Sequence, residues 1–268
     1  MNQQTPDITV IILTFNSSNY IEKCLDSVLK STKEAGLVSE IYVIDNGSKD
    51  GSIDILKRYK EIFPDIIKLK LFQVNRGTTI SRNYGLSRAK GKYILILDSD
   101  AYINTTALVH LINVLNKEPS IGIVVPKILY PSGNFQKSTD VFPTLIHKIK
   151  RLFFLKTEER KSKEVVNHLV RDVDYAISAF WLLKKELLDK VGLLDEKIFY
   201  SPEDVDYCIR VKKAGYRIVY DPRVEIIHDA QELSRIKLNK FFFSHLKGLF
   251  YLFKKHQYGI IRKSPIKK

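Results

Sequence analysis

Continuous apolar runs alternate with helical repeats through the first hundred residues. Four runs rich in β-branched residues, at 7–16, 39–45, 66–75 and 91–100, are typical of buried strands. Between them, apolar residues recur at helical spacing, and the three helices are marked by Ile21, Cys24, Leu25, Val28 and Leu29, by Ile53, Leu56 and Ile62, and by the stretch 77–91. Asn19 is expected to cap the first helix, and Gly91 to end the third. This alternation predicts an α/β fold with a mostly parallel sheet and helices on both faces.

The second half of the chain is less regular. We expect a strand at 120–130, then a mobile insertion at 131–171 that contains the basic amphipathic piece HKIKRLFFLK. After SAFWLLKK and a helix over 185–192, Ser201 is expected to cap a further helix, with Pro202 in its first position. These boundaries divide the chain into a domain at 1–230, whose halves are about 1–118 and 119–230, and a basic tail at 231–268.

Polar residues follow each of the four predicted strands. They are Thr14 and Asn16, with the apolar Phe15 between them, then Asp45 and Asn46, then Asn75 and Arg76, and finally Asp98, Ser99 and Asp100. In an open parallel sheet, ligands bind beyond the carboxyl ends of the strands. We therefore expect these residues to line one shared crevice.

The most informative pair is Asp98 and Asp100. On a strand, residues two apart point to the same side, where two carboxylates repel each other unless a cation lies between them. Oxygen ligands at such an edge suit Mg²⁺ or Mn²⁺, particularly when a diphosphate completes the coordination. The alternative is a solvated turn capped by Asp98, and the neighbouring polar strand ends favour the metal site.

The other polar positions each allow two interpretations. Asp45 is placed to accept hydrogen bonds from a nucleobase or ribose, or else it closes a turn in the turn-rich DNGSKDG. Arg76, Arg82 and Asn83 are placed to bind phosphate, with Gly77 allowing close approach, or else the arginines lie on a solvated helix face.

The last group of chemically interesting residues lies after residue 200. Glu203 and Asp204 are placed to supply a general base at a helix start, although acids there also favour the helix dipole. His228 ends an apolar run and is either a metal ligand or a hydrogen-bonded structural residue.

The charge is concentrated in the tail. The chain carries a net charge of +14, and residues 231–268 hold ten lysines and arginines against one acid. Apolar residues at near-helical spacing are flanked there by lysines: Phe241, Phe242, Leu246, Leu249, Phe250 and Phe253 beside Lys240, Lys247, Lys254 and Lys255. We expect an interfacial helix on an anionic membrane; the alternative is a helix that packs on the domain or on a second copy.

Composition also bounds the cellular setting. Two distant cysteines, Cys24 and Cys208, argue against a disulfide framework and fit a reducing compartment. The polar N-terminus lacks a signal-peptide core, and no apolar run is long enough to span a bilayer. We therefore expect a cytoplasmic protein, either free or bound to the cytoplasmic face of a membrane.

The order of the motifs is more specific than any one of them. IILTFN, IYVIDNGSKDGS, NRGTTISRNYGLSRAKGKYILILDSD and FYSPEDVDYCIRVKKAGYRIVYDPRVEIIH follow one another between Ile8 and His228. In this order the chain resembles the family 2 glycosyltransferases of the GT-A fold. The resemblance implies an inverting, metal-dependent enzyme that moves a sugar from a nucleotide-sugar to a glycan or lipid-linked acceptor. UDP is the nucleotide that the family uses most, with dTDP and GDP as alternatives.

The resemblance also assigns roles. It implies that Thr14, Asn16 and Asp45 line the nucleotide pocket, with Arg76, Arg82 and Asn83 near the diphosphate. It implies that Asp98 and Asp100 are the DxD motif, with Asp100 on the metal and Asp98 on the ribose or a water. Asp204 is implied as the base and His228 as a further metal contact. There are two departures. The family often has glycines and a serine after the histidine, where this chain has HDAQELS, and it often has a small residue or glycine where this chain has Ser178 and Ala179.

Two other functions are compatible with parts of the pattern. A nucleotidyltransferase would be expected to carry a glycine-rich, basic loop after its first strand, whereas TFNSSNY has neither glycine nor lysine. A non-enzymatic protein that binds nucleic acid through its basic tail would not gather acids in a cleft, because acids repel phosphate. We therefore expect no nucleic-acid partner.

Overall fold

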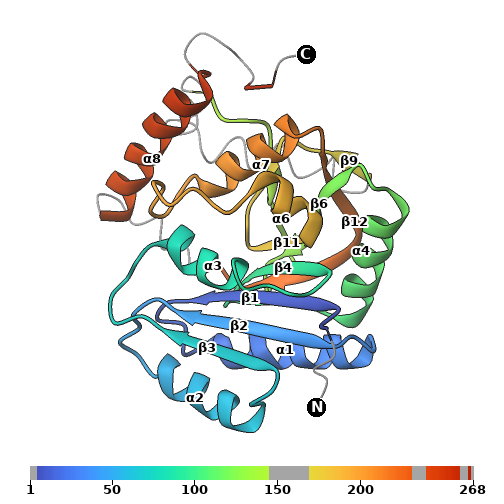
Figure 1. Cartoon of the computed structure of the whole chain (residues 1–268), viewed down its shortest axis with the longest axis vertical. Coiled ribbons are helices and arrows are strands. Elements are labelled where there is room, and N and C mark those ends of the chain that lie inside the picture. Colours follow the sequence, from blue (N-terminus) through green and yellow to red (C-terminus); the bar gives the residue numbers. More distant parts are fainter. Residues whose placement is uncertain (1–4, 145–168, 231–239, 260–264, 267–268) are drawn as a thin grey trace.

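A ten-stranded sheet runs through the centre of the molecule, with helices packed on both of its faces (Figure 1). The computed structural model describes residues 5–144, 169–230, 240–259 and 265–266, and gives only the backbone for 240–243. The strands are β1 (Ile8–Thr14), β2 (Ser39–Asp45), β3 (Ile67–Leu71), β4 (Tyr93–Asp98), β5 (Ala101–Tyr102), β6 (Ile121–Leu129), β7 (Phe135–Gln136), β8 (Thr139–Asp140), β9 (Arg171–Asp172), β10 (Tyr175–Ala176), β11 (Phe180–Lys184) and β12 (Arg217–His228). The helices are α1 (Ile21–Glu34), α2 (Ser52–Ile62), α3 (Thr78–Leu86), α4 (Thr105–Lys117), α6 (Lys185–Val191), α7 (Glu203–Lys213) and α8 (Lys240–His256).

The strand order brings the polar strand ends together. The main sheet reads β3-β2-β1-β4-β11-β6-β12-β5, and its first four strands are parallel. In this register Thr14 pairs with Asp45, and Leu13 pairs with Asp98. The carboxyl ends of β1, β2 and β4 therefore lie side by side, and the expected mostly parallel α/β fold is confirmed.

One antiparallel strand and one long strand complete the edge that carries the site. β11, which contains most of SAFWLLKK, runs antiparallel to both β4 and β6, so the sheet is mixed at its centre. β12 runs parallel to β6 and then pairs with the short strand β5, where His228 is opposite Ala101. This pairing places His228 beside the DSDA turn at 98–101.

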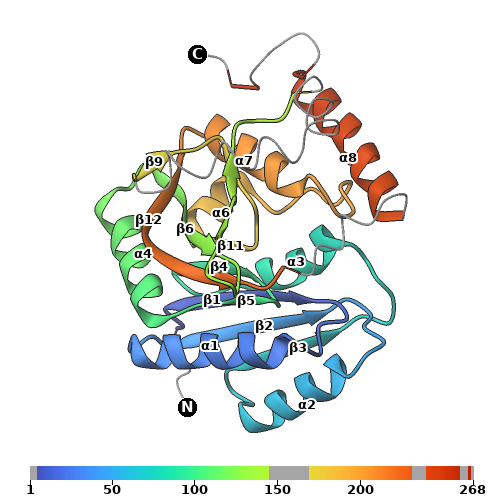
Figure 2. The same ribbon diagram turned by 180° about the vertical axis from the view of Figure 1, so that it is seen from behind.

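Two apolar cores fill the layers on either side of the sheet. Alternate residues of each strand point to opposite faces, so Ile12 packs with α1, α2 and α4 while Ile11 packs with α3, α6 and α7. The second core also takes in Leu249, Leu252 and Phe253 of α8. Figures 1 and 2 show α8 beside α7, on the side of the molecule away from α1 and α2.

Several predicted boundaries were wrong. β3 ends at Leu71 rather than at 75, and α3 covers 78–86 instead of 77–91. The start of α1 is at Ile21 and has no side-chain cap, so Asn19 does not fill that role. α7 begins at Glu203, and the hydroxyl of Ser201 is bonded to His245 in α8 instead of capping α7.

The insertion and the tail are described only in part. The piece HKIKRLFFLK lies outside the described residues, as do Gln231 to Asn239; the described flanks of the insertion form β7, β8 and β9. The division at 230 between domain and basic tail stays a prediction, although Leu249, Leu252 and Phe253 of α8 are part of the second core. Among the described residues, no helix combines the length and apolarity that crossing a bilayer requires.

Candidate active site

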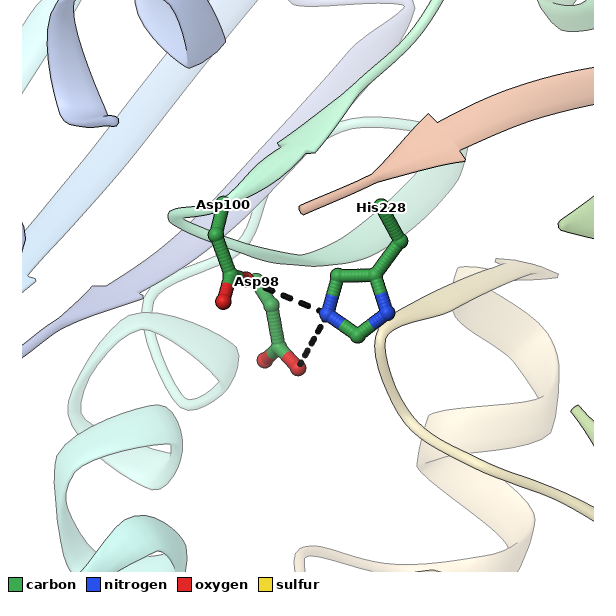
Figure 3. A group of neighbouring side chains, drawn as sticks. All are labelled: Asp98, Asp100 and His228. Carbon is green, nitrogen blue, oxygen red and sulfur yellow. Dashed lines mark ion pairs between the residues drawn. The ribbon is translucent and has the colours of Figure 1, made fainter. Parts of the chain in front are cut away.

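Asp98, Asp100 and His228 form a cluster at the carboxyl end of β4 (Figure 3). One ligand atom from each lies within 4.8 Å of the other two. The Nε2 atom of His228 is 3.2 Å from Asp100 Oδ1 and 4.0 Å from Asp98 Oδ2. Asp98 ends the strand and Asp100 lies in the turn before β5, so a tight turn brings the carboxylates together, and not the pleat of a strand as the sequence suggested.

The ring of His228 is held by a residue that the sequence did not single out. Gln136, from β7, accepts a hydrogen bond of 3.0 Å from Nδ1 of His228 through its Oε1 atom. An outer partner of this kind fixes the ring and directs Nε2 toward the carboxylates, as is usual for histidines that bind metals. Although burial opposes a charge on His228, the hydrogen bond to Asp100 and the charges of Asp100 and Asp98 raise its pKa.

These three residues fit a divalent cation. Two carboxylates and one imidazole are a common ligand set for Mn²⁺ and related ions. Burial and the charge of Asp100 raise the pKa of the Asp98 carboxyl, although Arg82 acts to lower it. A cation at this position would offset the repulsion between the two carboxylates. The side chain of Asp98 is 33% exposed, compared with 12% for Asp100 and 9% for His228, so the cluster opens to solvent on the Asp98 side.

Arg82 connects this cluster to the start of α7. Its Nη2 atom lies 2.5 Å from Asp98 Oδ1, and its Nη1 atom lies 3.3 Å from Glu203 Oε1. The hydroxyl of Ser178 accepts a 2.6 Å bond from the same Nη1. The Arg82 side chain is only 3% exposed, which excludes the alternative that it lies on a solvated helix face.

The two acids at the start of α7 have different environments. Glu203 is buried against Arg82 and Ser178, and burial together with the charge of Asp204 raises its pKa. Asp204 is half-buried, and its Oδ1 atom accepts a bond from the backbone of Val205. Of the two acids, Asp204 is therefore the more accessible to a substrate, and Glu203 is built into the protein interior.

On the nucleotide side, the turn interpretation of Asp45 is realised. Its carboxylate accepts bonds from the amides of Gly47 and Ser48 and from the Ser48 hydroxyl, and the residue is fully buried. Asn16 is exposed, and its side chain accepts a bond from the backbone of Lys49, which links the ends of β1 and β2. Phe15 is half-buried next to it. Contact of these residues with a nucleotide stays a prediction.

Two neighbouring hydroxyls also lie at this edge. Ser99 is buried, and its hydroxyl is 2.8 Å from that of Ser17, which ties the DSD turn to the loop after β1. Thr14 is fully buried, and within the described part of the chain its Oγ1 atom has no hydrogen-bond partner. Arg76 is exposed just past Asn75, at the rim of the same edge.

Asn46 and Asn83 are bonded within the protein, and their contact with a nucleotide stays a prediction. The Nδ2 atom of Asn46 donates to Asn75 Oδ1 and to the Gly77 carbonyl oxygen. Its Oδ1 atom accepts bonds from the Arg76 amide and the Ser81 hydroxyl. The amide of Asn83 is bonded to Leu194 and Glu196. Both side chains are buried and their bonds lie within the protein, so they have little capacity left for a nucleotide.

Gly77 allows another part of the chain to approach closely, and its contact with a phosphate stays a prediction. Its φ is +87°, and a Cβ at this position would lie 2.4 Å from the backbone oxygen of Phe199. The next residue, Thr78, donates its amide to that same oxygen at 2.7 Å. The start of α3 is therefore built to receive the segment 194–202 that leads into α7.

Tyr200 is a further residue that the sequence analysis missed. Burial, followed by the charges of Glu203 and Asp98, raises the pKa of its phenol to about 12. Its place in FYSPED, just before the acids, was the available signal.

The comparison with known families decides the class of the protein. The model of the family described as Glycosyl transferase family 2 matches residues 9–192, which is most of the chain. The chain belongs to this family. The family resemblance drawn from the motifs is thereby confirmed.

Curated relatives of this family 2 glycosyltransferase are distant. An uncharacterized glycosyltransferase of Rickettsia typhi is 27% identical over 235 residues, which cover 86% of this chain and 67% of the relative. A poly-beta-1,6-N-acetyl-D-glucosamine synthase of Staphylococcus aureus is 29% identical over 80% of this chain and 48% of its own length. A poly(ribitol-phosphate) beta-glucosyltransferase of Bacillus spizizenii is 36% identical, over 45% of this chain and 19% of the relative. The chain thus spans half or less of the two relatives with a named product.

Solved structures share the fold. A mannosyltransferase from Pyrobaculum calidifontis, in complex with GDP-Man and Mn²⁺, superposes with a TM-score of 0.63 at 21% identity, covering 94% of this chain and 64% of the other. The S. aureus protein TarS, residues 1–349 in complex with UDP-GlcNAc, gives a TM-score of 0.64 at 18% identity, covering 96% and 68%. At these identities the likeness establishes the GT-A fold.

Proposed function

We propose that this protein transfers a sugar from a nucleotide-sugar to a hydroxyl group of a glycan or lipid-linked acceptor, with inversion at the anomeric carbon and with the help of a divalent cation. The observation that carries the proposal is the position of Arg82, whose two terminal nitrogens contact Asp98 of the metal cluster and Glu203 at the start of α7. A single buried side chain thus links the metal cluster to the start of α7, where the proposed base Asp204 follows Glu203.

On the donor side, Asp100, Asp98 and His228 would hold Mg²⁺ or Mn²⁺. When bound, the cation offsets negative charge on the diphosphate leaving group. Support comes from the ligand set itself and from the Mn²⁺ in the mannosyltransferase of the same fold. The nucleoside would lie at the neighbouring strand ends, next to Thr14, Phe15, Asn16, Asp45 and Arg76.

On the acceptor side, Asp204 would accept the proton of the attacking hydroxyl. It lies at the N-terminus of α7, where the helix dipole favours its ionised form, and it is half-buried rather than enclosed. Glu203 would hold Arg82 in place through their ion pair. A single in-line displacement requires no covalent nucleophile, which is consistent with the inverting outcome that the family implies.

The nucleotide and the acceptor are proposed from the relatives. TarS is described with UDP-GlcNAc and the mannosyltransferase with GDP-Man, so we place UDP first and keep GDP and dTDP as alternatives. The curated relatives with named products act on or make polymers, a poly-N-acetylglucosamine and a poly(ribitol-phosphate). These names favour a glycan polymer or its lipid-linked precursor as acceptor. We further propose that the transfer takes place in the cytoplasm.

The outer face of α8 supports a contact with an anionic membrane. Phe250 is 58% exposed and Leu246 is 41% exposed, one turn apart, and Lys247 is exposed beside them. Amphipathic helices with apolar and basic residues on one face bind anionic membrane surfaces. The inner face of the same helix is packed on the domain, so the interaction that we propose is peripheral.

A thermal-shift panel of UDP-, GDP- and dTDP-sugars, with and without Mn²⁺, tests the donor half of the proposal. One donor class is expected to raise the melting temperature of the wild type only when Mn²⁺ is present, and Asp100→Ala is expected to lose that response. Product analysis by mass spectrometry with short glycan and lipid-linked acceptors then tests the transfer. A wild type that responds to no sugar-nucleotide in either condition would exclude the proposed function.

A further inference from the structure

The helix α8 contacts the segment that carries the proposed catalytic base. The segment 194–202 leads directly into α7, and Glu203 and Asp204 are the first residues of that helix. On one side the segment is bonded to α3, through Asn83 with Leu194 and Glu196 and through Thr78 and Thr79 with Phe199 and Ile198. The helix α8 contacts the same segment at Asp195 and Ser201.

A group of buried charges joins α8 to α7. Asp206, on the first turn of α7, is fully buried. Its Oδ1 atom lies 2.7 Å from Nζ of Lys255 and 2.7 Å from Nε2 of His256, while Oδ2 accepts a 3.0 Å bond from Arg210. Two consecutive residues of α8 therefore clasp a carboxylate that lies two residues after Asp204.

Lys255 also reaches the segment before α7. Its Nζ atom is 2.6 Å from Oδ2 of Asp195, which in addition accepts a 2.8 Å bond from the hydroxyl of Tyr251. One ammonium group of α8 thus bridges Asp195 and Asp206, and these two acids flank Glu203 and Asp204 along the chain. Because the Lys255 side chain is 26% exposed, solvent screens this contact only in part.

The N-terminal half of α8 meets the same segment by a close backbone contact. Ser201 bonds to Nδ1 of His245 at 2.9 Å. A Cβ added to Gly248 would lie 2.2 Å from the Ser201 carbonyl oxygen and 2.9 Å from Pro202. Only a residue without a side chain lets the helix come this near, so α8 follows the backbone of 201–202 closely.

From these contacts we infer that Lys255 and Gly248 of α8 are positioning residues for the reaction: they hold the start of α7 so that Asp204 faces the acceptor. Neither residue touches a substrate in this scheme. The inference rests on the proposed function for its kinetic consequence, but the contact itself is independent of that function. It also gives the inner face of the helix a task distinct from the membrane contact of its outer face.

The principal test compares two adjacent lysines in the full chain. Lys255→Ala removes the bridge, whereas Lys254→Ala removes an exposed lysine with the same charge. Displacement of Asp204 is expected to lower kcat with a soluble acceptor by about tenfold to about a hundredfold in Lys255→Ala. The dissociation constant of the donor with Mn²⁺ is expected to stay within about twofold, because the metal cluster lies on β4 and β12. Lys255→Arg should recover most of the activity.

A second variant makes the test independent of charge. Gly248→Ala must push α8 away from Ser201 and is expected to lower kcat in the same way, with donor binding unchanged. If Lys255→Ala fails to fold, Gly248→Ala and Lys255→Arg carry the test instead. Equal kcat in Lys255→Ala and Lys254→Ala, or a loss of donor binding as large as the loss of kcat, would overturn the inference.

Hydrogen exchange separates this inference from the proposed function. Peptides covering 195–206 are expected to exchange faster in Lys255→Ala than in Lys254→Ala, and this measurement needs no turnover. If the wild type transfers no sugar but this difference is seen, the proposed function fails while the structural contact stands. If the wild type is active and exchange at 195–206 is the same in both variants, the inference fails while the function stands.

Discussion

The guanidinium group of Arg82 lies 2.5 Å from the carboxylate of Asp98, in a site where the arginine is only 3% exposed. Removal of one partner from a buried ion pair leaves a charge without compensation, at a typical cost of about 3–5 kcal/mol. Arg82→Ala would strand Glu203 as well as Asp98, so we expect an unfolding free energy lower by about this amount in urea titrations. Arg58→Ala is the matched control, because its pair with Glu22 is half-exposed on both sides and such pairs contribute about 0–1 kcal/mol. Equal losses in both variants would contradict the interpretation of Arg82.

The roles of the two acids of α7 can be separated by amide substitutions. Asp204→Asn keeps the size of the side chain but removes the proton acceptor, and we expect kcat to fall by about 10²- to 10⁴-fold with donor binding retained. Glu203→Gln should lose less activity, because Glu203 contacts Arg82 rather than solvent. Initial rates and donor titrations of both variants provide the measurement. Wild-type turnover in Asp204→Asn, combined with an inactive Glu203→Gln, would transfer the role of base to Glu203.

Gln136 is expected to matter for metal affinity although it is not a ligand. Gln136→Leu removes the acceptor that orients the His228 ring, and loss of such an outer contact typically weakens metal binding by about 10- to 100-fold. Isothermal titration with Mn²⁺ would measure the change. Gln73→Leu is a suitable control, since Gln73 is an exposed glutamine. If Gln136→Leu bound Mn²⁺ as tightly as the wild type, the idea that Gln136 orients His228 for metal binding would be wrong.

The outer face of α8 offers a separate prediction. Phe250→Ser and Leu246→Ser remove exposed apolar groups without touching the inner core, so folding should be unaffected. Co-flotation of the wild type with vesicles that contain anionic lipid is expected, and it should be weakened in the double variant. A wild type that stays in the soluble fraction at low salt would refute the membrane contact.

The sequence predicted those features that depend on local pattern. The strands that end in Thr14, Asp45 and Asp98 were identified from β-branched runs, and their parallel pairing followed from the alternation with helices. The gathering of Asp98 with His228 followed only from family resemblance, because nothing local relates position 98 to position 228. The pairing of β12 with β5 brings them together, and β5 is too short to be seen as a strand in the sequence.

The protein partners of three predicted site residues could not be predicted from the sequence. Asn46, Gly77 and Asn83 belong to motifs next to the nucleotide edge, and polar residues there were assigned to the ligand. Each of them also contacts another part of the chain, which for Gly77 and Asn83 lies more than a hundred residues away, at Phe199 and Leu194. Likewise, the spacing of Leu249 and Phe253 indicates an amphipathic helix but does not say which surface covers its apolar face.

The final prediction concerns the effect of acid on the contact between α7 and α8. Although burial alone would raise the pKa of Asp206, the bonds from His256 and Lys255 and the charge of Arg210 lower it from 3.8 to about 2. A group whose pKa is depressed in the folded state stabilises the fold above its unfolded pKa, and this contribution is lost as the pH falls toward the folded value. The shift corresponds to about 2 kcal/mol, present near pH 6 and declining between about pH 4 and about pH 2.

Asp206→Asn should therefore be less stable than the wild type at pH 6, and the difference should shrink as the pH is lowered through 4. Urea titrations of both proteins between pH 6 and pH 3 measure this convergence. Asp189→Asn removes one negative charge from a surface pair with Lys185 and serves as the control for net charge. A difference between wild type and Asp206→Asn that stays constant over this pH range would mean that Asp206 is not held as a carboxylate by α8. Convergence would show that the buried acid near the proposed base is held as a carboxylate by its partners in α7 and α8.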